Sequence, residues 1–192
     1  WRHPALLPPR SALRGFPVAL AQGEADAAVT NSLEVAIAST SLALGIAWPA
    51  ARSLAGARGH WRNSVLVLLA LPLLVSPFAT GTGLTEWFIR LGLTGTRTGL
   101  VLAHLTVVLP YVLLVLTPSF TPRVVGLEEL ARSLGTPPLR RLALVTVPSL
   151  GAVIATDFLL GFLVSWSQSG MELAVGAGVP MLPMILLPFL AY

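Results

Sequence analysis

Cysteine and lysine are both absent from this 192-residue chain, and only 10% of its residues are charged. Without cysteine the chain has no disulfide and no thiolate ligand for a metal ion. Its 12 basic residues are all arginine. Without lysine it contains no P-loop, because the Gly-x-x-x-x-Gly-Lys-Ser/Thr pattern needs its lysine to reach the phosphates of ATP. Any ATP that drives this protein therefore has to bind to another subunit.

The scarcity of charged residues also indicates whether the chain folds in water or in a membrane. Soluble domains carry about 25% charged residues, whereas this chain has 10% charged and 55% hydrophobic residues. We therefore predict an all-α integral membrane protein. The arginines form no basic stripe with interleaved aromatic residues, so nucleic acid is not an expected partner. The methionines are too scattered to form a metal-binding row, and no metal site is expected.

About five apolar segments could cross a membrane as complete or partial helices, for which about 20 apolar residues are needed. They are residues 33–51, 64–80, 98–117, 142–166 and a proline-broken segment that begins near Met181. This pattern predicts a polytopic helical bundle, with residues 1–30 as an extracytoplasmic segment and 31–192 as the transmembrane core. Asn31 is the expected N-cap of the first span, with Glu34 at the third helical position.

Arginine residues in short loops indicate which side of the membrane each loop faces, since cytoplasmic loops are rich in basic residues. Two loops between the predicted spans carry most of them: Arg52, Arg58 and Arg62 in the first, and Arg123, Arg132, Arg140 and Arg141 in the second. We expect both loops to be cytoplasmic.

The second of these loops, residues 121–141, has strong helix signals. Thr121 followed by Pro122 is typical of an N-cap and a first helical position, and Thr136 followed by Pro137 repeats the signal. Gly135 lies between them, where a left-handed C-cap is expected. Glu128 and Arg132 have the spacing of a helical ion pair. The apolar residues have helical spacing and form one face: Leu127, Leu130, Ala131 and Leu134.

We call residues 121–141, with their two predicted helices and the glycine turn between them, the elbow. Two interpretations of the elbow are open. In one, it is an interfacial hairpin whose apolar face lies on the bilayer. In the other, it is a docking element for a cytoplasmic partner, which would explain how a chain without an ATP site is powered. The capped helices and the glycine turn make the segment rigid, and a rigid elbow can transmit movement.

The elbow resembles the EAA loop of binding-protein-dependent ABC importer permeases, the MetI-like family. That pattern is Glu-Ala-Ala, three residues, Gly, nine residues and Ile-x-Leu-Pro. This chain has Glu129-Leu130-Ala131, Gly135 and Val145-Thr146-Val147-Pro148 at the same spacing. It departs from the pattern at Leu130, which is bulkier than alanine, and by having valine in place of isoleucine and leucine.

The resemblance implies a transport subunit and not an enzyme. It implies that the elbow docks into a cytoplasmic ABC ATPase dimer, which binds ATP and Mg²⁺, through Glu128, Glu129, Leu130, Ala131, Gly135 and Pro148. The carboxylate of Glu129 would meet an arginine of that ATPase. Further implied partners are a second permease subunit, identical or paralogous, and an extracytoplasmic solute-binding protein, all at a bacterial or archaeal inner membrane. The family's first and last spans would be missing from this chain.

The segment "SWSQSGMELAVGAGVPMLP" is similar to spermidine- and thiamine-type permeases, which suggests thiamine or a polyamine as the substrate. Candidate residues of the translocation path are Asp157, Ser165, Trp166 and Gln168. Asp157 lies inside a span, where charge is costly, so it should face the bundle interior or a wet cavity. A structural hydrogen bond is the alternative role for it. Together with His104 it would also serve an ion-coupled secondary transporter or a channel, which is the alternative function.

Overall fold

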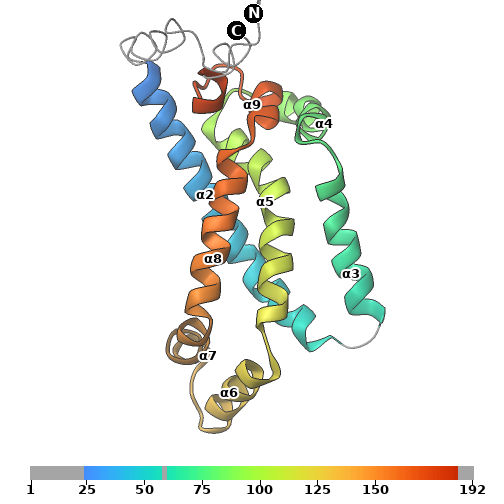
Figure 1. Ribbon diagram of the computed structural model, residues 1–192, viewed down its shortest axis with the longest axis vertical. Coiled ribbons are helices and arrows are strands. Elements are labelled where there is room, and N and C mark those ends of the chain that lie inside the picture. Colours follow the sequence, from blue (N-terminus) through green and yellow to red (C-terminus); the bar gives the residue numbers. More distant parts are fainter. Residues whose placement is uncertain (1–23, 58–59, 186–192) are drawn as a thin grey trace, which may run out of the picture. The chain divides into compact units, whose positions relative to one another are not determined.

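The computed structural model describes residues 24–57 and 60–185 (Figure 1). The elements in chain order are α2 (Glu24–Gly56), α3 (His60–Ala70), the 3-10 helix η1 (Leu71–Leu74), α4 (Pro77–Arg90), α5 (Arg97–Ser119), α6 (Pro122–Ser133), α7 (Pro138–Arg141), the π-helical segment η2 (Leu142–Thr146), α8 (Val147–Trp166) and α9 (Ser169–Val175). These described residues include no strand, which confirms the prediction of an all-α fold.

Among the described residues, three stretches are long and apolar enough to cross a membrane: Ala25–Gly56, Arg97–Ser119 and Pro138–Trp166. They contain the first, third and fourth predicted spans. The predicted N-cap at Asn31 is wrong, because α2 begins at Glu24. Acidic residues at positions 24 and 26 suit the first turn of a helix, where the helix dipole favours negative charge. Asn31 lies well inside α2, and its Nδ2 donates a hydrogen bond to the carbonyl oxygen of Pro180 at 2.9 Å.

The second predicted span is interrupted. Helix α3 ends at Ala70, η1 carries Pro72, and α4 begins afresh at Pro77. Each proline lacks an N–H group and crowds the preceding turn, so a continuous helix is disfavoured at both positions. The two helices count as a fourth span only if they are taken together as one broken element. Most of the fifth predicted segment, from residue 186 onward, lies outside the described residues.

The chain divides into two compact units, and each is described by itself. Unit 1 comprises the described parts of Trp1–Val35, Pro77–Ala103 and Ser167–Tyr192, and unit 2 comprises those of Ala36–Ser76 and His104–Trp166. In unit 1, α4 packs against α9, and Gly81 lies so close to α9 that an added Cβ would be 2.7 Å from the Cβ of Ala174. Val35, Leu100 and Met181 form a buried apolar cluster of this unit.

Unit 2 has a core of small and branched residues from its long helices. Ala43, Ala47 and Ala51 of α2 are fully buried and share one helical face. Opposite them lie the α5 residues Val108, Val112 and Leu116, which are also fully buried. Small residues let helix backbones approach closely in a lipid environment, where dispersion contacts drive association. This core holds the helices from which α6 and α7 project.

Candidate functional site

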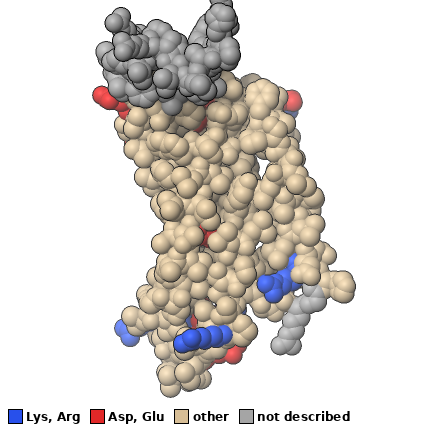
Figure 2. All heavy atoms as spheres, viewed as in Figure 1, with Lys and Arg blue, Asp and Glu red and all other residues tan. Residues whose placement is uncertain are grey.

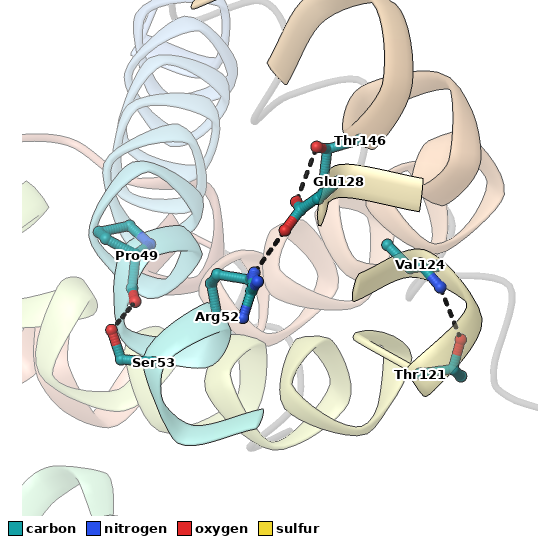
Figure 3. Close-up of polar contacts among 7 residues, drawn as sticks. All are labelled: Pro49, Arg52, Ser53, Thr121, Val124, Glu128 and Thr146. Carbon is teal, nitrogen blue, oxygen red and sulfur yellow. Dashed lines mark hydrogen bonds and ion pairs between the residues drawn. The ribbon is translucent and has the colours of Figure 1, made fainter. Parts of the chain in front are cut away.

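The helix α6 begins as the sequence predicts. Thr121 is its N-cap, Pro122 occupies the first position, and the backbone N–H of Val124 donates a hydrogen bond to the Thr121 hydroxyl oxygen at 3.4 Å (Figure 3). The cap satisfies one of the N–H groups that the first helical turn leaves without a partner.

The turn after α6 is a Schellman motif centred on Gly135. This glycine has a φ of 76°, which confirms the predicted left-handed conformation. Its N–H donates to the carbonyl oxygen of Arg132, and the N–H of Thr136 donates to that of Ala131, both at 3.0 Å. Side chains with a Cβ atom disfavour this backbone region, and glycine does not. The chain therefore reverses sharply at a fixed position.

The second helix of the elbow starts one residue later than predicted. Pro137, and not Thr136, is the N-cap of α7, and no side chain caps this end. Because a proline follows it, Pro137 is restricted to extended conformations, and its ψ is 150°. The chain then continues through η2 into α8. Pro148 has no N–H group for the carbonyl of Leu144, and its ring crowds that turn, which accounts for the widened π-helical segment before it.

Glu128 anchors the elbow to the helix bundle of unit 2. One of its carboxylate oxygens, Oε2, accepts from Nε of Arg52 at 2.5 Å, and the other, Oε1, accepts from the hydroxyl of Thr146 at 2.7 Å (Figure 3). The predicted pair between Glu128 and Arg132 is therefore wrong. Glu128 lies on the inner side of α6, where partners from α2 and η2 replace the solvent. One carboxylate of α6 is thus bonded to both α2 and η2.

The outer side of α6 has no partner among the described residues. Leu127, Leu130 and Leu134 are 40%, 57% and 77% exposed. Ala131, by contrast, is buried at 9% exposure, and Pro148 is exposed at the start of α8. Glu129 is exposed and lines a cavity beside α2. An exposed apolar row of this kind suits either of the two roles expected of the elbow, a bilayer surface or a protein surface.

Charge gathers around the elbow. Figure 2 shows basic side chains at the end of unit 2 that carries α6 and α7, and an almost uncharged surface along its long helices. The described arginines of this end include Arg123 and Arg132 on α6 and Arg140 and Arg141 on α7. A cluster of arginines next to apolar spans agrees with the prediction of a cytoplasmic loop.

None of the candidate path residues belongs to the elbow segment, residues 121–141. Asp157 is 1% exposed inside unit 2, and neither of its carboxylate oxygens has a hydrogen-bond partner among the described residues. Ser165 is also buried and bonds to Nδ1 of His104 at 2.8 Å and to the hydroxyl of Ser39 at 3.0 Å. His104 of α5 thus forms a hydrogen bond to a residue of α8.

The last two candidates differ in their surroundings. The ring of Trp166 stacks on Phe162 with 5.5 Å between the ring centroids. Gln168 belongs to unit 1, where it is 7% exposed and its Oε1 has no hydrogen-bond partner in the part of the chain that the structure describes. Asp157 and Ser165 share the buried face of α8, but this face is covered within unit 2.

Two buried or paired groups are not among the residues that the sequence predicts as functional. Arg52 is predicted only as part of a loop, although an arginine at the end of a span with no acid nearby in sequence is a signal that it pairs elsewhere. Glu172 of α9 is 1% exposed, and its Oε2 has no hydrogen-bond partner among the described residues. A single acid within the apolar run from Gly170 to Val175 was the available signal.

Burial raises the pKa of the Glu172 carboxyl to about 8, from an ordinary value of 4.5. The folded chain therefore holds this proton more tightly than the unfolded chain does. As pH rises from 4.5 to 8 the unfolded state loses the proton first, so the free energy of unfolding should fall across this window. We expect the apparent Tm in detergent to fall by at least a few degrees. Glu172→Gln should make that slope smaller.

Thermal unfolding followed at a series of pH values checks this expectation. Glu86→Gln is the matched control, because Glu86 is an exposed acid of unit 1 that pairs with Arg90 at 2.5 Å. An identical pH slope in the wild type and in Glu172→Gln would contradict the assignment.

Comparison with known proteins adds to this geometry. No protein-family model matches the chain. A Streptomyces antibioticus protein named as an ABC transporter permease, ORF1, is 34% identical over 173 residues, which are 87% of this chain and 70% of that protein. The chain belongs to the ABC transporter permeases.

Other relatives of this permease share one name. The molybdenum transport system permease protein ModB of Mycobacterium tuberculosis is 31% identical over 158 residues, which are 76% of this chain and 60% of that protein. ModB of Azotobacter vinelandii is 29% identical over 167 residues, which are 80% of this chain and 74% of that protein. The permease thus spans between three fifths and three quarters of the length of these relatives. None of them supports a thiamine or polyamine substrate.

Proposed function

We propose that this permease is the transmembrane subunit of an ATP-driven importer and that its α6–α7 elbow couples it to a separate ATPase. The observation that carries the proposal is the construction of the elbow. A side-chain cap starts α6, and a Schellman turn at Gly135 ends it. Glu128 bonds this helix to α2 and η2. The exposed row of leucines on its outer side is then the docking face.

The proposed partners are those that the family resemblance implies, and the permease relatives support them. ATP and Mg²⁺ would bind to a cytoplasmic ATPase dimer, whose closure would push on the elbow. A second permease subunit would complete the translocation path, and a solute-binding protein would deliver substrate from the other side. The MetI-like assignment is supported by the register of Glu129, Gly135 and Pro148. We place the elbow on the cytoplasmic side of an inner membrane because of its arginines.

For the substrate, we propose an oxyanion of the molybdate type, as the names of the ModB relatives suggest. The arrangement of acids in unit 2 agrees with this. Asp157, the one acid of α8, is 1% exposed and does not reach the surface of the described chain. An anion would therefore meet no exposed carboxylate on this helix. The ion-coupled alternative depends on Asp157 and His104 acting together, whereas His104 bonds to Ser165.

The test of the function is co-purification from native membranes. We expect the tagged permease to retain an ATPase subunit with a P-loop, and complementation of a deletion strain to restore uptake of molybdate but not of thiamine or spermidine. Isolation of the permease without any ATPase, combined with uptake that persists after ATP depletion, would favour the ion-coupled alternative.

A change on the docking face tests the elbow directly. Leu130→Glu places a charge in the exposed apolar row, so ATPase retention should fall about tenfold or more, since burying an unpaired charge at an interface costs several kcal/mol. Leu173→Glu is the matched control, because Leu173 is 50% exposed on α9 and lies outside the elbow. Equal ATPase retention by the two variants would remove the docking role from α6.

A further inference from the structure

A cavity of about 510 Å³ lies in unit 2 beside the elbow. It opens between the end of α2, the first turn of α3 and the corner between α5 and α6. Pro118, Phe120 and Val125 supply apolar walls, and Arg52, Arg62 and Glu129 supply charge. A cavity with these walls suits a ligand that has both an apolar and a charged part.

Two of the three charged groups lack a counter-ion in the described part of the chain. Arg52 is paired with Glu128 at 2.5 Å. Arg62 forms no ion pair with a described residue, and its Nε is buried without a hydrogen-bond partner. Glu129 likewise forms no ion pair there, although it lines the same cavity. One cation and one anion that have no ion-pair partner among the described residues thus line the same cavity.

The cavity lies at the ends of apolar helices. Two of the segments able to span a membrane end at Gly56 and Ser119, next to the cavity residues Ala55, Gly56 and Pro118. Arg62 lies in the first turn of α3. These positions put the cavity at the depth of the lipid headgroups, whichever side of the membrane it faces. Basic pockets between helices at this depth are typical sites for phosphate headgroups.

We propose that this cavity binds the headgroup of a zwitterionic aminophospholipid, with its phosphate on Arg62 and its primary ammonium on Glu129. A guanidinium donates well-directed hydrogen bonds to phosphate oxygens. A carboxylate accepts hydrogen bonds from a primary ammonium, whereas a quaternary ammonium has no N–H group to donate. The acyl chains would leave the cavity past Pro118 and Phe120. The proposal rests on the membrane location of the permease and is independent of what it transports.

This arrangement gives the Glu129 carboxylate a partner other than the ATPase arginine that the family resemblance implies. Because Glu129 is on α6, lipid in the cavity would bias the position of the coupling helix. The ATPase is the competing occupant, and its retention is therefore measured in parallel with lipid binding.

The experiment counts lipid adducts on the purified permease in detergent by native mass spectrometry. The added probes are phosphatidylethanolamine, phosphatidylcholine and phosphatidylglycerol, with free phosphoethanolamine as the competitor without acyl chains. Phosphatidylethanolamine should bind best. Arg62→Gln should weaken the binding of all three lipids about tenfold, because a hydrogen bond to a charged group is lost. Glu129→Gln should abolish only the preference for ethanolamine over choline.

Arg132→Gln is the matched control, because Arg132 is an exposed arginine of α6 that does not line the cavity. It should bind lipid as the wild type does. Displacement by free phosphoethanolamine would show that the headgroup alone suffices, and its failure would show that the acyl chains are needed. Equal adduct counts for the three lipids, or unchanged binding by both cavity variants, would overturn the proposal. Loss of the ATPase from both variants with lipid binding intact would overturn it in favour of an ATPase contact.

Discussion

Valine at position 161 should prevent the folded permease from accumulating in the membrane, whereas valine at position 151 should not. Both glycines lie in α8, so the two changes alter helix propensity equally. A Cβ at Gly161 would be 2.8 Å from Cγ2 of Thr40 and 3.2 and 3.3 Å from the γ-carbons of Val108 and Val112. A Cβ at Gly151 would have no neighbour within 4 Å.

The clash at Gly161 cannot be relieved by a flexible side chain, since threonine and valine are both β-branched and restricted at χ1. Overpacking a core by a few atoms costs about 1–3 kcal/mol, and valine adds its branches where α8 contacts α2 and α5. Alanine at 161 should be intermediate. Membrane yield and the apparent Tm in detergent measure the effect. Similar yields for the 151 and 161 variants would show that α8 does not pack against α2 and α5 in this way.

The elements that the sequence predicted correctly are those that depend on adjacent residues. Thr121 and Pro122 start α6 because one hydroxyl reaches an N–H group within the same turn. Gly135 ends the helix because its own backbone adopts a positive φ. The long apolar segments within α5 and α8 follow from hydropathy alone.

The errors arose where a more distant residue decided the outcome. Glu128 has Arg132 at helical spacing, but it bonds to Arg52, which is 76 positions away in the sequence, and to Thr146. Glu34 has the spacing of a capping residue, but it lies inside α2 and pairs with Arg97 at 2.6 Å. A sequence window shows only the partner at helical spacing. It does not show a distant residue that tertiary packing brings closer.

Arginine at position 135 should leave the permease in the membrane but reduce ATPase retention and uptake about tenfold or more. The left-handed backbone of Gly135 disfavours any residue with a Cβ, at about 1–2 kcal/mol. That cost is too small to unfold the bundle by itself. A Cβ at this position would have no neighbour within 4 Å, so the arginine would project from the turn instead of clashing within the chain. The bulk and charge would then lie where the ATPase is proposed to dock.

Two further variants distinguish the effect of backbone strain at Gly135 from the effect of blocking the surface where the ATPase is proposed to dock. Gly135→Asn keeps the left-handed conformation at little cost, because asparagine tolerates it better than other residues, so its transport should be close to that of the wild type. Gly92→Arg makes the same chemical change at another glycine with a positive φ, 67°, and with open space around it. Gly92 lies in unit 1, outside the elbow, so ATPase retention should be normal in this variant. If Gly92→Arg and Gly135→Arg lost the ATPase to the same extent, backbone strain would explain both losses. If neither lost it, the turn at Gly135 would have no part in docking.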